Sequence, residues 1–89
     1  MVSKEVSVNC PLGLTMQPAG VICTVAGRYK CKILMEHAHG ITNLKSMLSV
    51  LGSSIKPNER VIVSCDGDDE DKALEALVQT FETELMGEI

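Results

Sequence analysis

The chain has 89 residues, 45% of them hydrophobic and 22% charged, which predicts one globular domain over residues 1–89 rather than a disordered chain. Twelve acidic and eight basic residues give a net charge of −4, which argues against binding nucleic acid, since such proteins need a basic surface to neutralise phosphates. No apolar run approaches the roughly 20 residues of a membrane span, and the opening Met-Val-Ser-Lys-Glu does not resemble a signal peptide. We therefore expect a cytoplasmic protein without membrane insertion.

The first quarter of the chain predicts a strand, a break and a helix. Residues 2–9 alternate between apolar and polar positions, the period of a strand with one buried face. The run Cys10-Pro11-Leu12-Gly13 ends this strand, because Pro and Gly together mark a loop. From Met16 to about Gly27 apolar residues recur at helical spacing, in a stripe of Ala19, Ile22, Cys23 and Ala26.

The start of this helix, Gly13 to Ala19, has the features of an anion-binding end. Thr15 is placed to be the N-cap, whose hydroxyl accepts from a backbone N–H of the first turn. Pro18 is tolerated there because the first-turn N–H groups have no intrahelical partners. Free N–H groups and the helix dipole at Thr15, Met16 and Gln17 could therefore hold an anion such as phosphate.

The middle of the chain predicts a hairpin and a short helix. Residues 29–36 alternate as a strand with a largely basic outer face, and residues 41–43 form the returning strand. His37 and His39 lie in the turn between them, and without a third ligand nearby we interpret them as solvated turn residues, not metal ligands. Residues 47–52 predict a helix too short to be stable unless it docks on the sheet, and Ser46 suits its N-cap.

The last third predicts a central strand and the final helix. Residues 60–65 form an apolar run, which indicates an interior position in the sheet. The acidic run from Asp66 to Asp71 lacks the spacing of a calcium loop, so we interpret its carboxylates as cap and dipole residues. The helix that follows carries a core stripe of Leu74, Leu77, Val78, Phe81 and Leu85.

The four cysteines give no sign of a site. They form no C-x-x-C pair and have no closely spaced histidine, whereas zinc and redox sites usually need close ligand pairs. We expect free thiols packed as small hydrophobic groups at Cys10, Cys23, Cys31 and Cys65.

The order of the predicted elements is β-α-β-β-α-β-α. Helices gathered on one face of a small antiparallel sheet make an α+β open-faced sandwich, here with four strands, three helices on one face and the other face wet.

Three segments of this pattern resemble the HPr family, the small phosphocarriers of the bacterial sugar phosphotransferase system. They are Gly13 to Ala19 at the head of the first helix, Asn43 to Leu48, and Gly67 to Leu77. The resemblance covers essentially the whole chain. It implies the open-faced sandwich fold, a role in sugar transport without enzymatic activity, and no cofactor or metal.

The phosphocarrier motif departs from the family at two positions. Thr15 stands where the family has the His that accepts the phosphoryl group, and Gln17 stands where it has an Arg. A neutral imidazole is available as a nucleophile at physiological pH, and an Arg would stabilise the phosphoryl group by charge-assisted hydrogen bonds. Thr15 has a barely ionised hydroxyl and Gln17 has no charge, so we expect no phosphoryl carriage through position 15.

The segment from Asn43 to Leu48 resembles the family's regulatory serine segment. In Gram-positive members the serine matching Ser46 is phosphorylated by a dedicated HPr-type kinase, and the phosphorylated protein binds a LacI-type catabolite regulator. The resemblance therefore implies phosphorylation at Ser46 and partner binding by an apolar surface of Gly20, Met47, Leu48 and Leu51. The simpler alternatives are a plain N-cap at Ser46 and a docking role for the three apolar side chains of the short helix.

The leading hypothesis is an HPr-like regulatory protein of carbon catabolite control, switched at Ser46. It is similar to the catabolite-repression HPr-like branch, which also lacks the His and keeps the serine, but which typically has Gln at the position of Thr15. Two alternatives stay open: a working phosphocarrier with an unusual acceptor, which would bind phosphotransferase-system enzymes, and an HPr scaffold repurposed for another partner.

Overall fold

The computed structural model describes residues 1–10 and 13–84, and the elements follow the predicted order. The predicted loop residues Pro11 and Leu12 and the predicted core residue Leu85 lie outside the described residues. One short π-helical segment of five residues, Thr80–Glu84, follows α3. The strands and helices are β1 (Val2–Ser7), α1 (Met16–Ala26), β2 (Lys32–His37), β3 (Gly40–Asn43), α2 (Met47–Gly52), β4 (Arg60–Asp66) and α3 (Glu70–Gln79).

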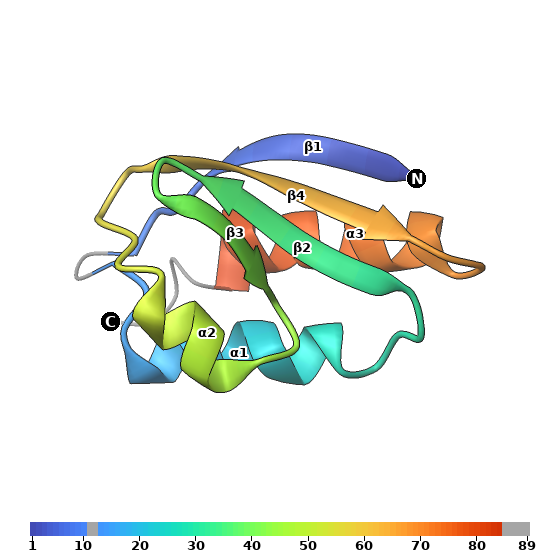
Figure 1. Cartoon of the computed structure of the whole chain (residues 1–89), viewed down its shortest axis with the longest axis horizontal. Helices are drawn as coiled ribbons and strands as arrows, with labels where there is room; N and C mark the ends of the chain where they lie inside the picture. The colour runs from blue at the N-terminus through green and yellow to red at the C-terminus, as the bar shows by residue number, and fades with distance from the viewer. Residues whose placement is uncertain (11–12, 85–89) are drawn as a thin grey trace.

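The four strands form one antiparallel sheet in the order β1-β4-β2-β3, and the helices pack on one of its faces (Figure 1). This confirms the predicted α+β open-faced sandwich. The register sets Ile33 of β2 opposite Cys65 of β4, and Val2 of β1 opposite the same cysteine on the other side. In the described part of the chain no helix is long and apolar enough to cross a membrane.

The core lies between the sheet and the helices. Odd-numbered residues of β2 and β4 face the helices because successive strand side chains point to opposite faces. Each large side chain buried there stabilises the fold by roughly 1.5–3 kcal/mol relative to exposure. The largest of these side chains that are fully buried are Phe81, Ile22, Ile33, Met35, Leu44 and Leu77.

β4 lies between β1 and β2, so its predicted interior position is confirmed. Its burial alternates all the same, and Ile62 is 39% exposed on the face that carries no helix. A wet outer face is typical of an antiparallel sheet covered on one side only.

β1 ends at Ser7, two residues before its predicted end, and both ends of β2 differ from the prediction. β2 begins at Lys32, not at residue 29, because the chain leaving α1 first makes turns in which Tyr29 N–H donates to the Ala26 carbonyl. β2 also extends to His37, which the sequence placed in the turn. The predicted basic outer face is correspondingly smaller, since Lys30 precedes the strand.

Candidate functional site

α1 begins where the sequence predicted, but its cap differs. Thr15 has the extended backbone of an N-cap, yet among the described residues its hydroxyl makes no capping hydrogen bond. Its N–H donates to the Gly13 carbonyl at 3.0 Å, and Pro18 has no N–H to offer. At most two first-turn donors, the N–H groups of Met16 and Gln17, therefore remain for an anion. The side chains of all three residues, Thr15 to Gln17, are exposed.

Gly13 fixes the approach of the chain to α1. Its φ of +76° lies in the left-handed region, and a Cβ at this position would lie 2.3 Å from the carbonyl oxygen of Ile55. The next residue, Leu14, donates its N–H to that same oxygen at 3.3 Å and is buried. The loop after α2 thus holds the start of α1, which explains why glycine is required here.

Ser46 is the N-cap of α2, as predicted. Its Oγ accepts the N–H of Ser49 at 3.3 Å, its carbonyl accepts the N–H of Val50 at 3.0 Å, and its side chain is half-buried. The preceding Lys45 is held on both sides, because its N–H donates to Asn43 Oδ1 at 2.9 Å and its Nζ donates to the Tyr29 carbonyl at 2.6 Å. An ammonium group is therefore held one residue before the serine hydroxyl.

α1 and α2 lie side by side and run antiparallel (Figure 1). The start of α2 lies beside the middle and end of α1, since Met47 Cε is 3.9 Å from the Cβ position of Gly20 and Lys45 reaches Tyr29. The loop after α2 contacts the start of α1 through Ile55. Thr15 and Ser46 therefore lie toward opposite ends of this helix pair.

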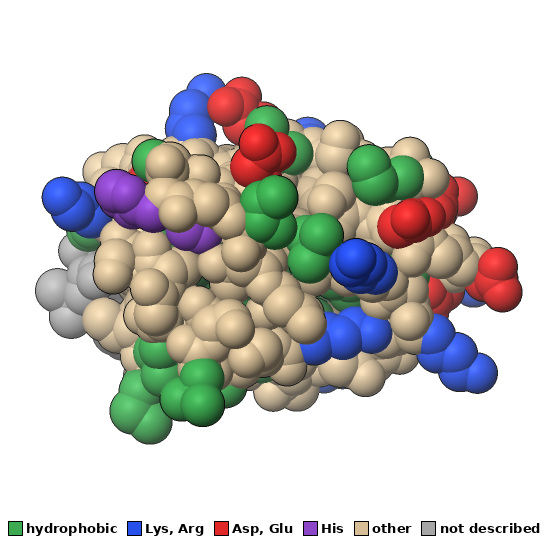
Figure 2. Space-filling view, viewed as in Figure 1, with side chains coloured by type: hydrophobic (Ala, Val, Ile, Leu, Met, Phe, Trp, Pro, Cys, Tyr) green, Lys and Arg blue, Asp and Glu red, His purple; other side chains and the backbone are tan. Residues whose placement is uncertain are grey.

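An apolar surface lies on this helix pair. Met16 is 71% exposed and Leu48 is 83% exposed, while Met47 and Leu51 are half-buried and pack against the core. Figure 2 shows exposed hydrophobic side chains gathered at the lower left of the molecule, the region of α2 and the start of α1 in Figure 1. We call this surface the apolar patch; its residues are Met16, Gly20, Met47, Leu48 and Leu51.

The histidines lie on the β2–β3 hairpin, away from the start of α1 (Figure 1). His37 is half-buried rather than solvated: its Nδ1 accepts the N–H of His39 at 3.3 Å, which assigns the proton to Nε2, 2.8 Å from Thr42 Oγ1. No group of three or more metal-ligating side chains occurs within the described residues.

The acidic turn before α3 makes hydrogen bonds to a distant segment, which the sequence did not predict. Asp69 occupies the N-cap position of α3, but its carboxylate accepts the N–H groups of Lys30 at 2.8 Å and Cys31 at 3.0 Å. Glu70 and Asp71 lie in the first turn of α3, as predicted, and Glu70 accepts the Gly67 N–H at 3.1 Å. The Asp69 contacts span 38 and 39 residues of sequence, so no local pattern could reveal them.

The fold and this helix pair define a small open-faced sandwich of the phosphocarrier type. The family model described as "PTS HPr component phosphorylation site" matches residues 2–83. The chain belongs to the HPr family, whose members are phosphocarriers of the phosphotransferase system and not enzymes.

The chain resembles both phosphocarrier HPr proteins and HPr-like Crh proteins. It is 33% identical over 85 residues to the phosphocarrier protein HPr of Lysinibacillus sphaericus, covering 96% of each chain. It is 31% identical over 84 residues to the HPr-like protein Crh of Halalkalibacterium halodurans, covering 94% of this chain and all of the relative.

Solved structures agree with this assignment. HPr-C-His of Thermoanaerobacter tengcongensis superposes over 100% of both chains with a TM-score of 0.93 at 26% identity. The Bacillus subtilis catabolite-repression protein Crh superposes over 96% of this chain and 98% of its own, with a TM-score of 0.75 at 27% identity.

Proposed function

We propose that this protein is an HPr-like regulator of the phosphotransferase and carbon-catabolite-control system, switched by phosphorylation at Ser46 and without phosphoryl carriage at position 15. One observation carries the proposal. A partly exposed serine hydroxyl adjoins an exposed apolar patch, whereas the start of α1 offers no ionisable side chain.

The chemistry of position 15 supports the second half of the proposal. A threonine hydroxyl needs an adjacent general base to act as a nucleophile. The residues on either side, Leu14 and Met16, are apolar, and Gln17 can donate hydrogen bonds but cannot supply positive charge. The His37 imidazole is held in hydrogen bonds of its own, and His39 lies on the same hairpin, away from α1.

A phosphate at Ser46 would alter the charge beside the apolar patch. It adds about −1.5 to −2 charges at pH 7 together with strong acceptor oxygens. The Ser49 N–H that the hydroxyl now engages could donate to the phosphate, and the preceding residue, Lys45, carries an ammonium group. The neutral cap would become an anion at the edge of an apolar surface.

The apolar patch suits a protein partner. Leu48 projects almost fully into solvent, and two methionines provide adaptable apolar contact area. We propose an HPr-type kinase as the enzyme that modifies Ser46 and a LacI-type catabolite regulator as the partner that reads the product. The likeness to two Crh proteins supports this choice.

The direct test is phosphorylation by an HPr-type kinase and ATP, followed by mass mapping of the modified peptide. We expect one phosphate on Ser46 and none on a Ser46→Ala variant. Ser49→Ala is the matched control, because Ser49 is an exposed serine of the same helix and its N–H is unaffected by the substitution. Phosphate that persists on Ser46→Ala would refute the proposal.

A further inference from the structure

Two cysteines that are far apart in sequence meet at one end of the sheet. Cys65 lies near the end of β4 and Cys31 immediately precedes β2, and both face the helices. The register pairs Cys65 with Ile33, so Cys31 is the diagonal neighbour of Cys65 across the two strands. Each thiol also shifts the pKa of the other, as neighbouring side chains do. The absence of a C-x-x-C motif therefore does not mean the absence of a dithiol.

Gly67 explains how the Cys31 side chain fits against the end of β4. It follows β4 with a φ of +155°, and a Cβ at this position would lie 2.7 Å from the Cβ of Cys31. Because glycine leaves this space free, the Cys31 side chain packs against the backbone of the turn. A larger residue at position 67 would therefore displace Cys31.

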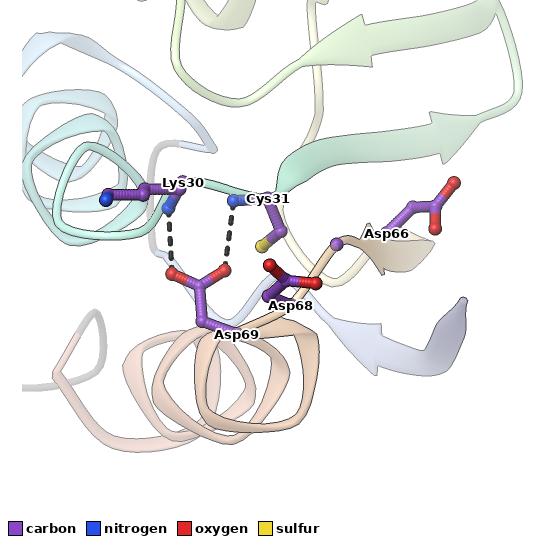
Figure 3. Close-up of a pocket in the computed structure, with 6 residues that line it drawn as sticks. Lys30, Cys31, Asp66, Asp68 and Asp69 are labelled. Atoms are coloured by element: carbon purple, nitrogen blue, oxygen red, sulfur yellow. Dashed lines mark hydrogen bonds between the residues drawn. The ribbon is translucent and has the colours of Figure 1, made fainter.

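Asp69 holds Cys31 in place. Its carboxylate accepts the backbone N–H of Cys31 at 3.0 Å, and its presence raises the pKa of the Cys31 thiol. Figure 3 shows the Cys31 side chain extending from the start of β2 toward the turn that carries Asp68 and Asp69. Both sulfurs are thus positioned by fixed elements rather than by a free loop.

A small reagent can approach this pair from one side. A cavity of about 490 Å³ opens beside Cys31, although the residue itself is only 3% exposed. Cys65 is 0% exposed and is not among the residues that line this cavity. The cavity lining consists of Lys30, Cys31, Asp66, Gly67, Asp68 and Asp69.

We propose that Cys31 and Cys65 form a dithiol modification site, which hydrogen peroxide converts into an intramolecular disulfide between the start of β2 and the end of β4. In the first step the Cys31 sulfur attacks one peroxide oxygen, the O–O bond breaks, and Cys31 sulfenic acid and water form. In the second step the Cys65 sulfur attacks the sulfenic sulfur, the S–O bond breaks, and the disulfide and a second water form. Both cysteines are oxidised by one electron each, and peroxide is reduced.

Burial and the charges around the pair set the rate of oxidation. Burial, above all, raises the pKa of Cys31, and burial raises the pKa of Cys65 to about 12. Asp69 and Glu70 act in the same direction, while Lys45 opposes them at Cys31. Since the thiolate is the reacting form, oxidation is slow at neutral pH and accelerates by up to about tenfold per pH unit above it.

The test treats the intact protein with hydrogen peroxide at pH 7 and pH 9, alkylates the remaining thiols, and maps the peptides by mass. We expect a Cys31–Cys65 linked peptide that forms faster at pH 9, is reversed by dithiothreitol, and is still formed by the control variant Cys23→Ser. Cys65→Ser should stop at Cys31 sulfenic acid, which dimedone traps.

The wild-type protein alone is enough to test the proposal, so a variant that folds poorly does not affect the conclusion. No Cys31–Cys65 peptide at a peroxide exposure that oxidises the half-buried Cys23 would overturn the proposal. Linked peptides that contain mainly Cys10 or Cys23 would overturn it equally, because they would show random pairing.

Discussion

Asp69 at the start of α3 accepts the backbone N–H of Cys31 at 3.0 Å, joining the last helix to the second strand. The same carboxylate accepts the N–H of Lys30 at 2.8 Å. Two backbone donors that precede β2 are thereby satisfied by a side chain, the exposed one of Lys30 and the partly buried one of Cys31.

The first prediction concerns acid stability. The backbone N–H of Lys30, above all, holds the pKa of Asp69 below its ordinary value. A depressed folded pKa contributes stability above the unfolded pKa of about 3.9, and this contribution is lost as pH falls through the folded value. Asp69→Asn should therefore lower the urea midpoint at pH 7, with a difference from wild type that shrinks toward pH 2.

Asp68→Asn is the control for this experiment. Asp68 is an exposed neighbour whose carboxylate accepts no hydrogen bond from the described residues. Its midpoint should follow that of the wild type across the pH range. An Asp69→Asn difference that stays constant from pH 7 to pH 2 would contradict the assigned role.

The second prediction compares two glycines. Gly13→Ala should destabilise the protein by roughly 2 kcal/mol or more, because alanine at positive φ is strained and its Cβ would meet the Ile55 carbonyl. Gly52→Ala should be neutral or stabilising by up to about 1 kcal/mol, since Gly52 ends α2 with no heavy atom within 4 Å of its Cβ position. Urea unfolding measures both, and equal effects would show that the contact at Gly13 is unimportant.

The third prediction concerns phosphoryl transfer. The wild-type protein should take no phosphate from phosphoenolpyruvate and the first enzyme of the phosphotransferase system. Thr15→His combined with Gln17→Arg should restore some labelling, because both positions are exposed at the start of α1 and the new side chains meet no core. Equal labelling of the two proteins would mean that another acceptor operates.

The fourth prediction separates binding from folding. Leu48→Ala should change the free energy of unfolding by less than about 0.5 kcal/mol, since Leu48 is 83% exposed. It should weaken binding of the Ser46-phosphorylated protein to the LacI-type regulator by roughly tenfold, the usual effect of truncating an apolar anchor.

Ile41→Ala is the matched control for Leu48. Ile41 is 67% exposed on β3, on the sheet face that the helices leave open. Isothermal titration should give wild-type affinity for Ile41→Ala. If both variants lose affinity alike, the partner does not read the apolar patch.

The elements that follow local periodicity were predictable. The stripe of α1, the cap and length of α2 and the central place of β4 all follow from neighbouring residues. The start of β2 was wrong by three residues, because the turns after Ala26 and the carboxylate of Asp69 hold that segment out of the sheet.

The candidate site was predictable in its residues but not in its contacts. Ser46 was expected to cap α2 and does so, whereas Thr15 was expected to cap with its hydroxyl and does not. The antiparallel arrangement of α1 and α2 and the meeting of Cys31 with Cys65 depend on pairings between distant segments. Such pairings carry no signature in a single sequence.

The antiparallel run of α1 and α2 places Thr15 and Ser46 toward opposite ends of one apolar patch, and none of the hydrogen bonds described for Ser46 involves residues 13–19. Substitutions at Thr15 therefore leave the hydrogen bonds of Ser46 intact. On this scaffold, phosphoryl chemistry and partner recognition can be inherited separately, so a lineage can lose the one and keep a ready surface for the other.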